Sequence, residues 1–179
     1  MKIKDLEFVP FISPARIQKR VKELSQQISD DYNEKNPVFL PILNGSFMFA
    51  ADLFKNIEIP CRVSFVKISS YGGTMSSGQL KTLIGIEESL FNQHVIIVED
   101  IIDSGLTLTR MMDELRALGA KSVEVTALLR KQPARDKKIE ARYVGFDIDH
   151  EFVVGYGLDY DGLSRNCKEI LKANEPFHK

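Results

Sequence analysis

The chain has 179 residues, of which 44% are hydrophobic and 27% are charged, so it can form one packed core and is too short for three domains. Its 24 basic and 25 acidic residues leave a formal net charge of −1, which gives no long-range field to attract nucleic acid or an anionic membrane. The longest uncharged stretch, residues 36–51, contains two prolines and an Asn-Gly-Ser turn, unlike an apolar membrane span. These features favour a small-molecule partner and predict neither a nucleic-acid partner nor a membrane segment.

Two further features predict a reducing, cytoplasmic location. Residues 1–7 contain four charged side chains and are not followed by the apolar core of a secretory signal. The two cysteines, Cys61 and Cys167, lack the paired spacing of a zinc site and are too few for a disulfide framework.

The N-terminal part of the chain predicts one amphipathic helix and one strand–loop–helix unit. Ser13 followed by Pro14 is typical of a helix start, and apolar residues then recur at spacings of three and four: Ile17, Val21, Leu24 and Ile28. Residues 38–43 form a short apolar run that predicts a strand and ends in the Asn-Gly-Ser turn at residues 44–46. Residues 47–54 then predict a second helix.

The next segment predicts a pair of strands joined by a long loop. Residues 61–68 nearly alternate between apolar and polar, as in a strand with one covered face, and residues 82–86 are the expected partner. Residues 69–81 between them are polar and rich in glycine. A loop of this length is often a lid over a site, although the composition alone favours an ordinary surface loop with no functional role.

The following part of the chain predicts a strand–helix–strand crossover. Residues 95–98 are a β-branched run, the pattern of a strand buried on both faces of a parallel sheet. An apolar helical stripe follows and ends at Gly119, and residues 122–129 predict the next strand. Residues 143–148 and 152–156 add two strand candidates. This order predicts an α/β fold with an open sheet, ligands at the carboxyl ends of its strands, and a single domain over residues 1–179.

Residues 99–107 are the most informative about function, and they lie where the predicted buried strand ends and the helix begins. A helix N-terminus with a glycine and two hydroxyls is a phosphate cradle. Carboxylates beside it would repel a phosphate by about 4 kcal/mol at about 4 Å and an effective dielectric of about 20. Sugar hydroxyls and a Mg²⁺ ion facing the acids would compensate, which predicts a phosphorylated sugar as ligand. The helix macrodipole alone could explain Asp103 but not the adjacent Glu99 and Asp100.

Residues 99–107 resemble the phosphoribosyl-pyrophosphate-binding signature of the type I phosphoribosyltransferases, and the whole chain resembles their hypoxanthine-guanine branch. Matching positions follow one another along nearly the entire chain: Asn44 and Gly45, Ser70 and Tyr71, Lys131, Arg135, residues 152–156, Asp159 and Arg165. The resemblance implies an open, mainly parallel five-stranded sheet flanked by helices, with a small hood formed by both chain ends. It also implies a homodimer or a homotetramer.

The implied reaction is Mg²⁺-dependent transfer of 5-phosphoribosyl from phosphoribosyl pyrophosphate to N9 of a 6-oxopurine, giving IMP or GMP and pyrophosphate. By the resemblance, Glu99 and Asp100 hold the ribose hydroxyls and their metal ion. The 5′-phosphate is bound by the following turn, which consists of Asp103, Ser104, Gly105, Leu106 and Thr107.

The pyrophosphate group is assigned to three other segments by the same resemblance. The turn at Asn44 and Gly45 presents backbone N–H groups, in the family often through a non-proline cis peptide, although this chain has Asn44 where a lysine is frequent. Arg165 contacts pyrophosphate with its guanidinium fork. Ser70 and Tyr71 begin the family's catalytic lid, which excludes water from the transition state.

The purine is assigned to the later part of the chain. Lys131 donates to the exocyclic O6, and because an ammonium group cannot accept a hydrogen bond, the site would reject adenine. Phe152 stacks on the purine and the backbone of Val153 meets its edge, while Asp159 binds a second Mg²⁺ and approaches the base. Without the resemblance, the ordinary interpretation is a solvated side chain for Lys131, a core aromatic for Phe152 and a surface turn residue for Asp159. Arg135 matches a family arginine near the site.

Asp103 has two possible roles at N7 of the purine. It can remove the ring proton as a general base, or it can only stabilise developing positive charge. A non-catalytic regulator of the same fold that senses phosphoribosyl pyrophosphate is the main alternative function, and a transferase for another base is a second. The near-neutral charge argues against a nucleic-acid-binding regulator, and Asp103 and Lys131 argue for catalysis.

Overall fold

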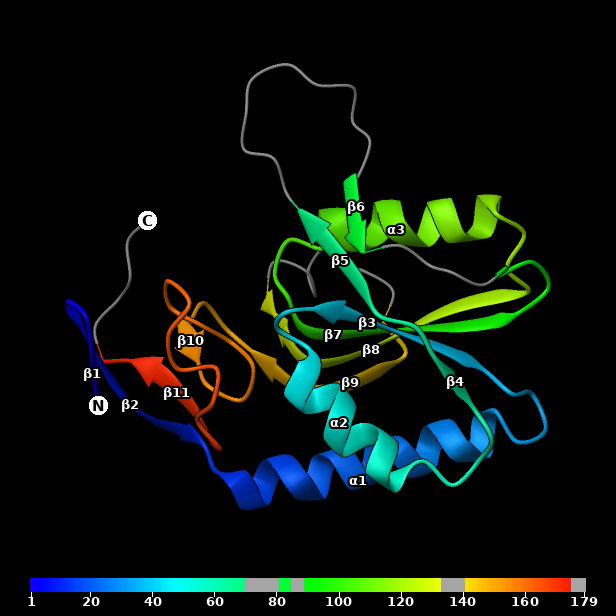
Figure 1. The fold of residues 1–179 in the computed structure, drawn as a ribbon. Helices are drawn as coiled ribbons and strands as arrows, with labels where there is room; N and C mark the ends of the chain where they lie inside the picture. The colour runs from blue at the N-terminus through cyan, green and yellow to red at the C-terminus, as the bar shows by residue number, and fades with distance from the viewer. Residues whose placement is uncertain (70–80, 85–88, 133–140, 175–179) are drawn as a thin grey trace.

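The computed structural model describes residues 1–69, 81–84, 89–132 and 141–174. Strands in this part of the chain form two sheets, a large one in the body of the molecule and a small one at the side where both chain ends lie (Figure 1). The positions of Ser70, Tyr71 and Arg135, all expected near the site, fall outside the described residues. Within the described residues, no helix has the length and apolar character needed to cross a membrane.

The large sheet has seven strands and is mainly parallel. Its strand order is β6-β5-β3-β7-β8-β9, and β4 pairs with β3 beside β5. Only β6 runs antiparallel to its neighbour. The strands are β3 (Val38–Leu43), β4 (Arg62–Val63), β5 (Val66–Ser69), β6 (Lys81–Ile84), β7 (His94–Ile102), β8 (Ser122–Lys131) and β9 (Tyr143–Ile148).

The predicted α/β class, parallel sheet and flanking helices are confirmed, with two strands more than the five expected. The strand expected at residues 61–68 is split into β4 and β5, which pair with opposite ends of β3 along the same edge. The second addition is β6, the partner strand expected near residues 82–86, which runs antiparallel to β5. The parallel part therefore occupies five positions across the sheet.

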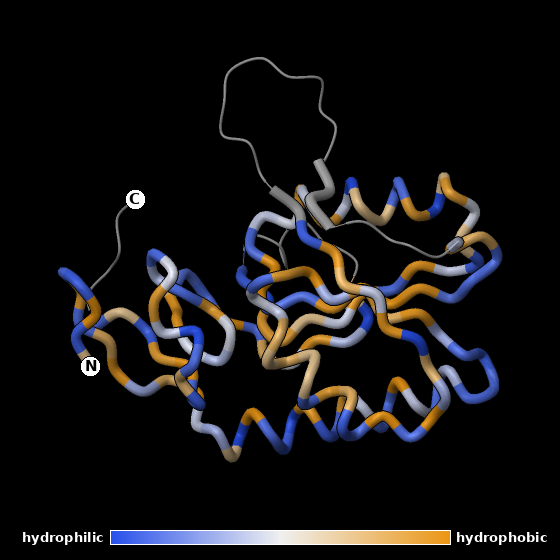
Figure 2. The backbone as a smooth tube through the Cα atoms, in the orientation of Figure 1, coloured by the Kyte–Doolittle hydropathy of each residue, from blue (hydrophilic) through white to orange (hydrophobic). Residues whose placement is uncertain are grey.

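Helices cover both faces of this sheet (Figure 1). The helices α1 (Pro14–Asp31) and α2 (Phe47–Asn56) pack on one face, and α3 (Leu106–Ala117) packs on the other. Strand β7 supplies both cores by alternation, because Ile96 and Val98 join the α1–α2 core while Val95 and Ile97 join the α3 core. In Figure 2 the central strands carry long apolar stretches, as the predicted two-sided burial of β7 requires.

The start of α1 confirms the pattern in the sequence. The Ser13 side chain accepts a hydrogen bond from the backbone N–H of Arg16, and proline occupies the first turn. The four apolar residues of the predicted stripe are all fully buried: Ile17, Val21, Leu24 and Ile28.

The small sheet, which we call the hood, is antiparallel and has the order β1-β2-β11-β10. Its strands are β1 (Lys2–Ile3), β2 (Leu6–Ile12), β10 (Val153–Val154) and β11 (Ile170–Ala173). Of the strand expected at residues 152–156 only β10 forms, because Gly155 and Tyr156 both take positive φ angles and turn the chain. The hood therefore presents the loop at residues 157–165 next to the large sheet.

One buried hydroxyl in the large sheet gives a prediction about stability. Thr126 of β8 is fully buried, and its Oγ1 has no hydrogen-bond partner in the described part of the chain. Replacing it by valine, of similar shape, is expected to raise the free energy of unfolding by about 1 kcal/mol, measured by urea denaturation. The control is Ser25→Ala, since the Ser25 hydroxyl donates to carbonyl oxygens of Val21 and Leu53 and its removal should destabilise. Equal losses in both variants would contradict this reasoning.

Candidate active site

The carboxyl ends of the parallel strands meet at one edge of the large sheet. Strand β3 leads into the turn at residues 44–46, and its neighbour β7 contains Glu99 and Asp100 and leads into the turn at residues 103–105. The next strand, β8, ends at Lys131. Because parallel strands end together, these predicted site segments lie side by side, as an open α/β sheet predicts.

The turn after β7 encloses a cavity of about 150 Å³. Its lining consists of Glu99, Ile101, Ile102 and the continuous run 103–108, so every residue predicted to bind the 5′-phosphate belongs to it. Gly105 is the N-cap of α3, and no side chain caps this helix start. Backbone N–H groups of the first turn therefore remain for an anion, as the sequence predicts.

The turn at residues 44–46 packs against the acidic pair. The Leu43–Asn44 peptide bond is cis, which agrees with the expectation from the family. A Cβ atom at Gly45 would overlap the carboxylate of Asp100, so only glycine lets this side chain approach so closely. Asp100 thus lies between its own strand and the turn expected to bind pyrophosphate.

The surroundings of Glu99 and Asp100 disfavour the charged forms of both carboxyl groups. Burial, and then the neighbouring charge of Asp100, raise the pKa of Glu99 well above its usual value. Burial raises the pKa of Asp100 to about 6, against the lowering effects of the Ile101 backbone N–H and the charge of Arg165. One oxygen of Glu99, Oε2, is buried with no partner in the described part of the chain.

These features fit a divalent cation that is bound together with a ligand. Buried carboxylate oxygens that lack donors are the ligands that Mg²⁺ prefers. Among the described residues, however, no three histidine, cysteine, aspartate or glutamate side chains lie close enough together to form a metal site. Mg²⁺ commonly takes one or two carboxylates and completes its shell with water and substrate phosphates, so the acidic pair suits that mode of binding.

The hood loop brings Asp159 and Arg165 to the same edge. The Arg165 guanidinium pairs with Asp159 at 2.5 Å and donates to the carbonyl oxygen of Gly157 at 2.7 Å. A Cβ atom at Gly157 would overlap the carbonyl oxygen of Gly45, so the hood loop and the β3 turn are in direct contact. This role of Gly157 could not be predicted from the sequence, since it depends on a contact between distant segments.

At the end of β8, Lys131 pairs with Asp103. The Lys131 ammonium lies 3.4 Å from Asp103 Oδ2. The lysine side chain is 17% exposed and the aspartate side chain 64%, so Asp103 is the more accessible of the two. A ligand placed here would meet a cationic donor and a carboxylate acceptor next to each other.

Phe152 and Val153 lie in the hood. Phe152 is partly buried and makes an edge-on contact with Tyr160, with ring centroids 5.6 Å apart, and a tilted contact with Phe8. Val153 is buried, and β10 pairs it with Lys172 of β11. The aromatic contacts explain how the hood holds the Phe152 ring, which the sequence alone left open between core and site.

A second contact that sequence reasoning missed joins the hood to α2. The hydroxyl of Tyr156 donates to Asp52 Oδ2 at 2.7 Å. Tyr156 has a φ of 51°, a value rare outside glycine, so no propensity rule would have predicted this turn.

Comparison with known proteins places the chain in a family. The model of the phosphoribosyl transferase domain matches residues 13–161. The hypoxanthine-guanine phosphoribosyltransferase of Bacillus subtilis is 42% identical over 93% of this chain and 92% of its own length. The crystal structure of a hypoxanthine-guanine phosphoribosyltransferase from Bacillus anthracis is 39% identical, covers 94% of this chain and 99% of its own, and has a TM-score of 0.85.

A longer relative matches as well. The bifunctional protein TilS/HprT of Listeria monocytogenes is 41% identical over 89% of this chain, which spans 25% of that protein's length. The match to the domain model and the full-length likeness to the Bacillus proteins agree with each other, and the fold has a cavity at the end of β7. The chain belongs to the phosphoribosyltransferase family, in its hypoxanthine-guanine branch.

Proposed function

We propose that this chain transfers the 5-phosphoribosyl group from phosphoribosyl pyrophosphate to N9 of a 6-oxopurine, in the salvage of hypoxanthine and guanine. The observation that carries the proposal is the Lys131–Asp103 pair beside the cavity at residues 103–108. A donor and an acceptor matched to neighbouring atoms of a purine thus stand next to a phosphate-sized cradle on a helix N-terminus. The products are IMP or GMP and pyrophosphate.

The phosphoribosyl group is held by the turn after β7. Backbone N–H groups of residues 104–107 and the hydroxyls of Ser104 and Thr107 donate to the 5′-phosphate, and Leu106 contributes only its backbone. Glu99 and Asp100 accept from the ribose hydroxyls. The Gly45 turn and Arg165 bind the pyrophosphate group, for which the Arg165 fork is suited once it exchanges Asp159 for phosphate oxygens.

The acidic pair and Asp159 are the proposed Mg²⁺ ligands. Glu99 Oε2, which has no hydrogen-bond partner in the described part of the chain, supports this assignment. The burial that raises the pKa of Asp100 supports it as well. When bound, Mg²⁺ neutralises pyrophosphate charge and so makes pyrophosphate a better leaving group. Glu99 and Asp100 on β7 and Asp159 in the hood loop would hold the ion through carboxylate oxygens.

The purine lies between the end of β8 and the hood. Lys131 donates to O6, Phe152 stacks on the ring, and the backbone at Val153 and Asp159 meets its edge. As N9 forms its bond to C1′, the bond from C1′ to the pyrophosphate oxygen breaks, and the proton on N7 passes to the Asp103 carboxylate. The Asp103 side chain is exposed, which leaves this carboxylate accessible to the purine edge.

The test is an absorbance assay with hypoxanthine, guanine, xanthine and adenine in turn, each with phosphoribosyl pyrophosphate and Mg²⁺. Lys131→Ala is expected to lower kcat/KM for hypoxanthine by about 10- to 100-fold, the effect of losing one charged hydrogen bond, and to reduce discrimination against adenine. The control is Arg130→Ala, because the neighbouring Arg130 pairs with Asp147 instead. Absence of any purine turnover, together with no calorimetric binding of the phosphoribosyl donor, would refute the proposal.

We further propose that the protein acts in the cytoplasm as a homodimer or homotetramer. Large apolar side chains that remain exposed support association: Phe47 at the start of α2, Phe65 between β4 and β5, and Phe91 in the turn before β7. Light scattering of the purified protein measures the assembly directly.

A further inference from the structure

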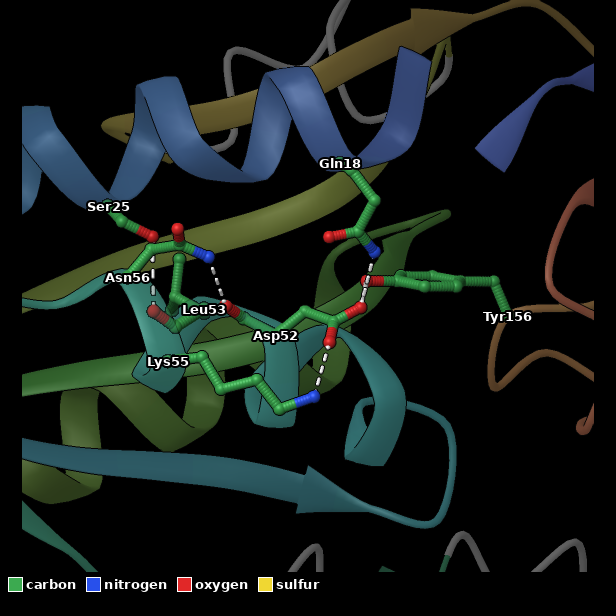
Figure 3. Close-up of polar contacts among 7 residues, drawn as sticks. All are labelled: Gln18, Ser25, Asp52, Leu53, Lys55, Asn56 and Tyr156. Carbon is green, nitrogen blue, oxygen red and sulfur yellow. Dashed lines mark hydrogen bonds and ion pairs between the residues drawn. The ribbon is translucent and has the colours of Figure 1, made fainter. Parts of the chain in front are cut away.

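A carboxylate outside the proposed substrate site gathers three donors from three segments. Asp52 of α2 accepts from Tyr156 of the hood at 2.7 Å, from the side-chain amide of Gln18 on α1 at 2.5 Å, and pairs with Lys55 at 3.0 Å. Figure 3 shows the Tyr156 ring reaching from the hood towards α2, with Gln18 meeting the same carboxylate oxygen from α1. A buried tyrosine hydroxyl bonded to a carboxylate is a charge-assisted hydrogen bond.

The protonation states suit this contact. Burial raises the pKa of Asp52, but the hydrogen bonds from Tyr156, Gln18 and Lys55 outweigh it and hold the pKa below its usual value. Burial, followed by the bond to Asp52, raises the pKa of Tyr156, so its hydroxyl remains a donor. The pair is therefore a carboxylate and a neutral phenol throughout the neutral range.

Each end of the contact is directly connected to a proposed pyrophosphate-binding segment. Asp52 lies on α2, the helix that begins immediately after the turn containing Gly45. Ser25 of α1 donates to the Leu53 carbonyl at 3.1 Å, which fixes α2 in place (Figure 3). Tyr156 is the residue before Gly157, whose carbonyl accepts from Arg165 and whose Cα faces the Gly45 carbonyl.

Two backbone hydrogen bonds hold the base of the loop at residues 157–165. The backbone N–H of Tyr156 donates to the carbonyl oxygen of Cys167 at 2.8 Å, and that of Gly157 donates to the carbonyl oxygen of Arg165 at 2.9 Å. Tyr156 is 2% exposed and packs in the α1–α2 core, and its hydroxyl is the polar atom of the side chain. A shift of Tyr156 would move Gly157 away from Gly45 and carry Arg165 with it.

We propose that the Tyr156–Asp52 hydrogen bond is a positioning contact that sets the spacing between the Gly45 turn and the Arg165 loop, and so determines affinity for the pyrophosphate group. This inference rests on the proposed transferase function. Tyr156 and Asp52 are positioning residues, since they act through Gly157 and α2 and are not assigned a contact with substrate.

The test compares two tyrosine-to-phenylalanine variants. Tyr156→Phe is expected to weaken binding of Mg²⁺-pyrophosphate, measured by calorimetry, and to raise KM for phosphoribosyl pyrophosphate by about five- to tenfold, while KM for the purine stays within about twofold. Tyr143→Phe is the matched control, because Tyr143 is also 2% exposed and also donates to an aspartate, Asp31, at 2.7 Å. Its loss should lower thermal stability to a similar degree without changing pyrophosphate affinity.

Amide hydrogen exchange and a second variant add independent readouts. Exchange at residues 157–165 should accelerate in Tyr156→Phe and not in Tyr143→Phe. Asp52→Asn keeps an oxygen acceptor for the Tyr156 hydroxyl and should bind pyrophosphate more tightly than Asp52→Leu, which keeps none.

The outcomes separate this inference from the proposed function. A wild-type protein that ignores both phosphoribosyl pyrophosphate and pyrophosphate would defeat the proposed function itself. Wild-type binding that is matched by Tyr156→Phe, or weakened equally by Tyr143→Phe, would overturn the positioning role and leave the function standing. An equal rise in KM for the purine and for the phosphoribosyl donor would also overturn it.

Discussion

Replacing Asp103 by asparagine is expected to lower kcat for nucleotide formation by about 10²- to 10⁴-fold, the usual contribution of a positioned general base. Affinity for IMP should change little, because asparagine has nearly the same shape and keeps an oxygen that accepts hydrogen bonds. The amide oxygen, however, cannot take the proton from N7 at neutral pH. Steady-state kinetics and calorimetric titration with IMP measure the two effects separately.

The same variant distinguishes the two roles that remained open for this carboxylate. If Asp103 is the base, the loss of kcat should fall within the full range of about 10²- to 10⁴-fold. If it only stabilises charge, a smaller loss is expected. Asp113→Asn on α3 is the control, because Asp113 is 68% exposed and forms only a surface ion pair with Arg116. Unchanged turnover in Asp103→Asn would exclude both roles.

The sequence predicted the architecture of this edge well because its signals are local. The β-branched run of β7 and the polar turn after it predicted a buried strand leading into a helix N-terminus, and residues 103–108 do line one cavity. The Ser13–Pro14 helix start and the apolar stripe of the same helix could be predicted equally well, since both depend on neighbours within a few residues. The resemblance added the expectation of a cis peptide before Asn44.

Contacts between distant segments could not be predicted in the same way. The Tyr156–Asp52 bond joins residues 104 positions apart, and the overlap of Gly157 with the Gly45 carbonyl depends on how the hood is placed. The Lys131–Asp103 pair follows from the parallel alignment of β7 with β8, in which Ile102 lies opposite Arg130. Such pairings require the register of the sheet, which periodicity alone does not determine.

At Asp100, a substitution that removes the charge is expected to raise the stability of the fold and to lower activity. The Asp100→Asn variant should be more stable than the wild type at pH 7.5 in the absence of ligands, by about 1 to 3 kcal/mol, because a pKa raised from 3.8 to about 6 corresponds to that range. Asparagine keeps an oxygen to accept from the Ile101 backbone N–H at the same place. It removes the buried charge that lies against the Gly45 turn.

The pH dependence of this gain follows from the direction of the shift. Because the pKa of Asp100 is higher in the folded protein than in the unfolded chain, the folded state binds the proton more tightly, and wild-type stability falls as pH rises from about 4 to about 6. Below that window the carboxyl is neutral in both states, so the difference between variant and wild type should vanish. Above it the difference should be constant. Urea denaturation at about pH 3, below the window, and at pH 7.5 measures both limits, with exposed Asp30→Asn as the control.

Activity should change in the opposite direction. Asp100→Asn removes one of two adjacent charges proposed to bind Mg²⁺, so KM for the phosphoribosyl donor should rise and the Mg²⁺ concentration needed for half-maximal rate should increase. A variant that is both more stable and less active identifies Asp100 as a carboxylate kept for its ligand, since packing alone would favour the neutral side chain. A variant that is less stable at pH 7.5, or whose gain persists in full at about pH 3, would show instead that the Asp100 charge is satisfied within the protein.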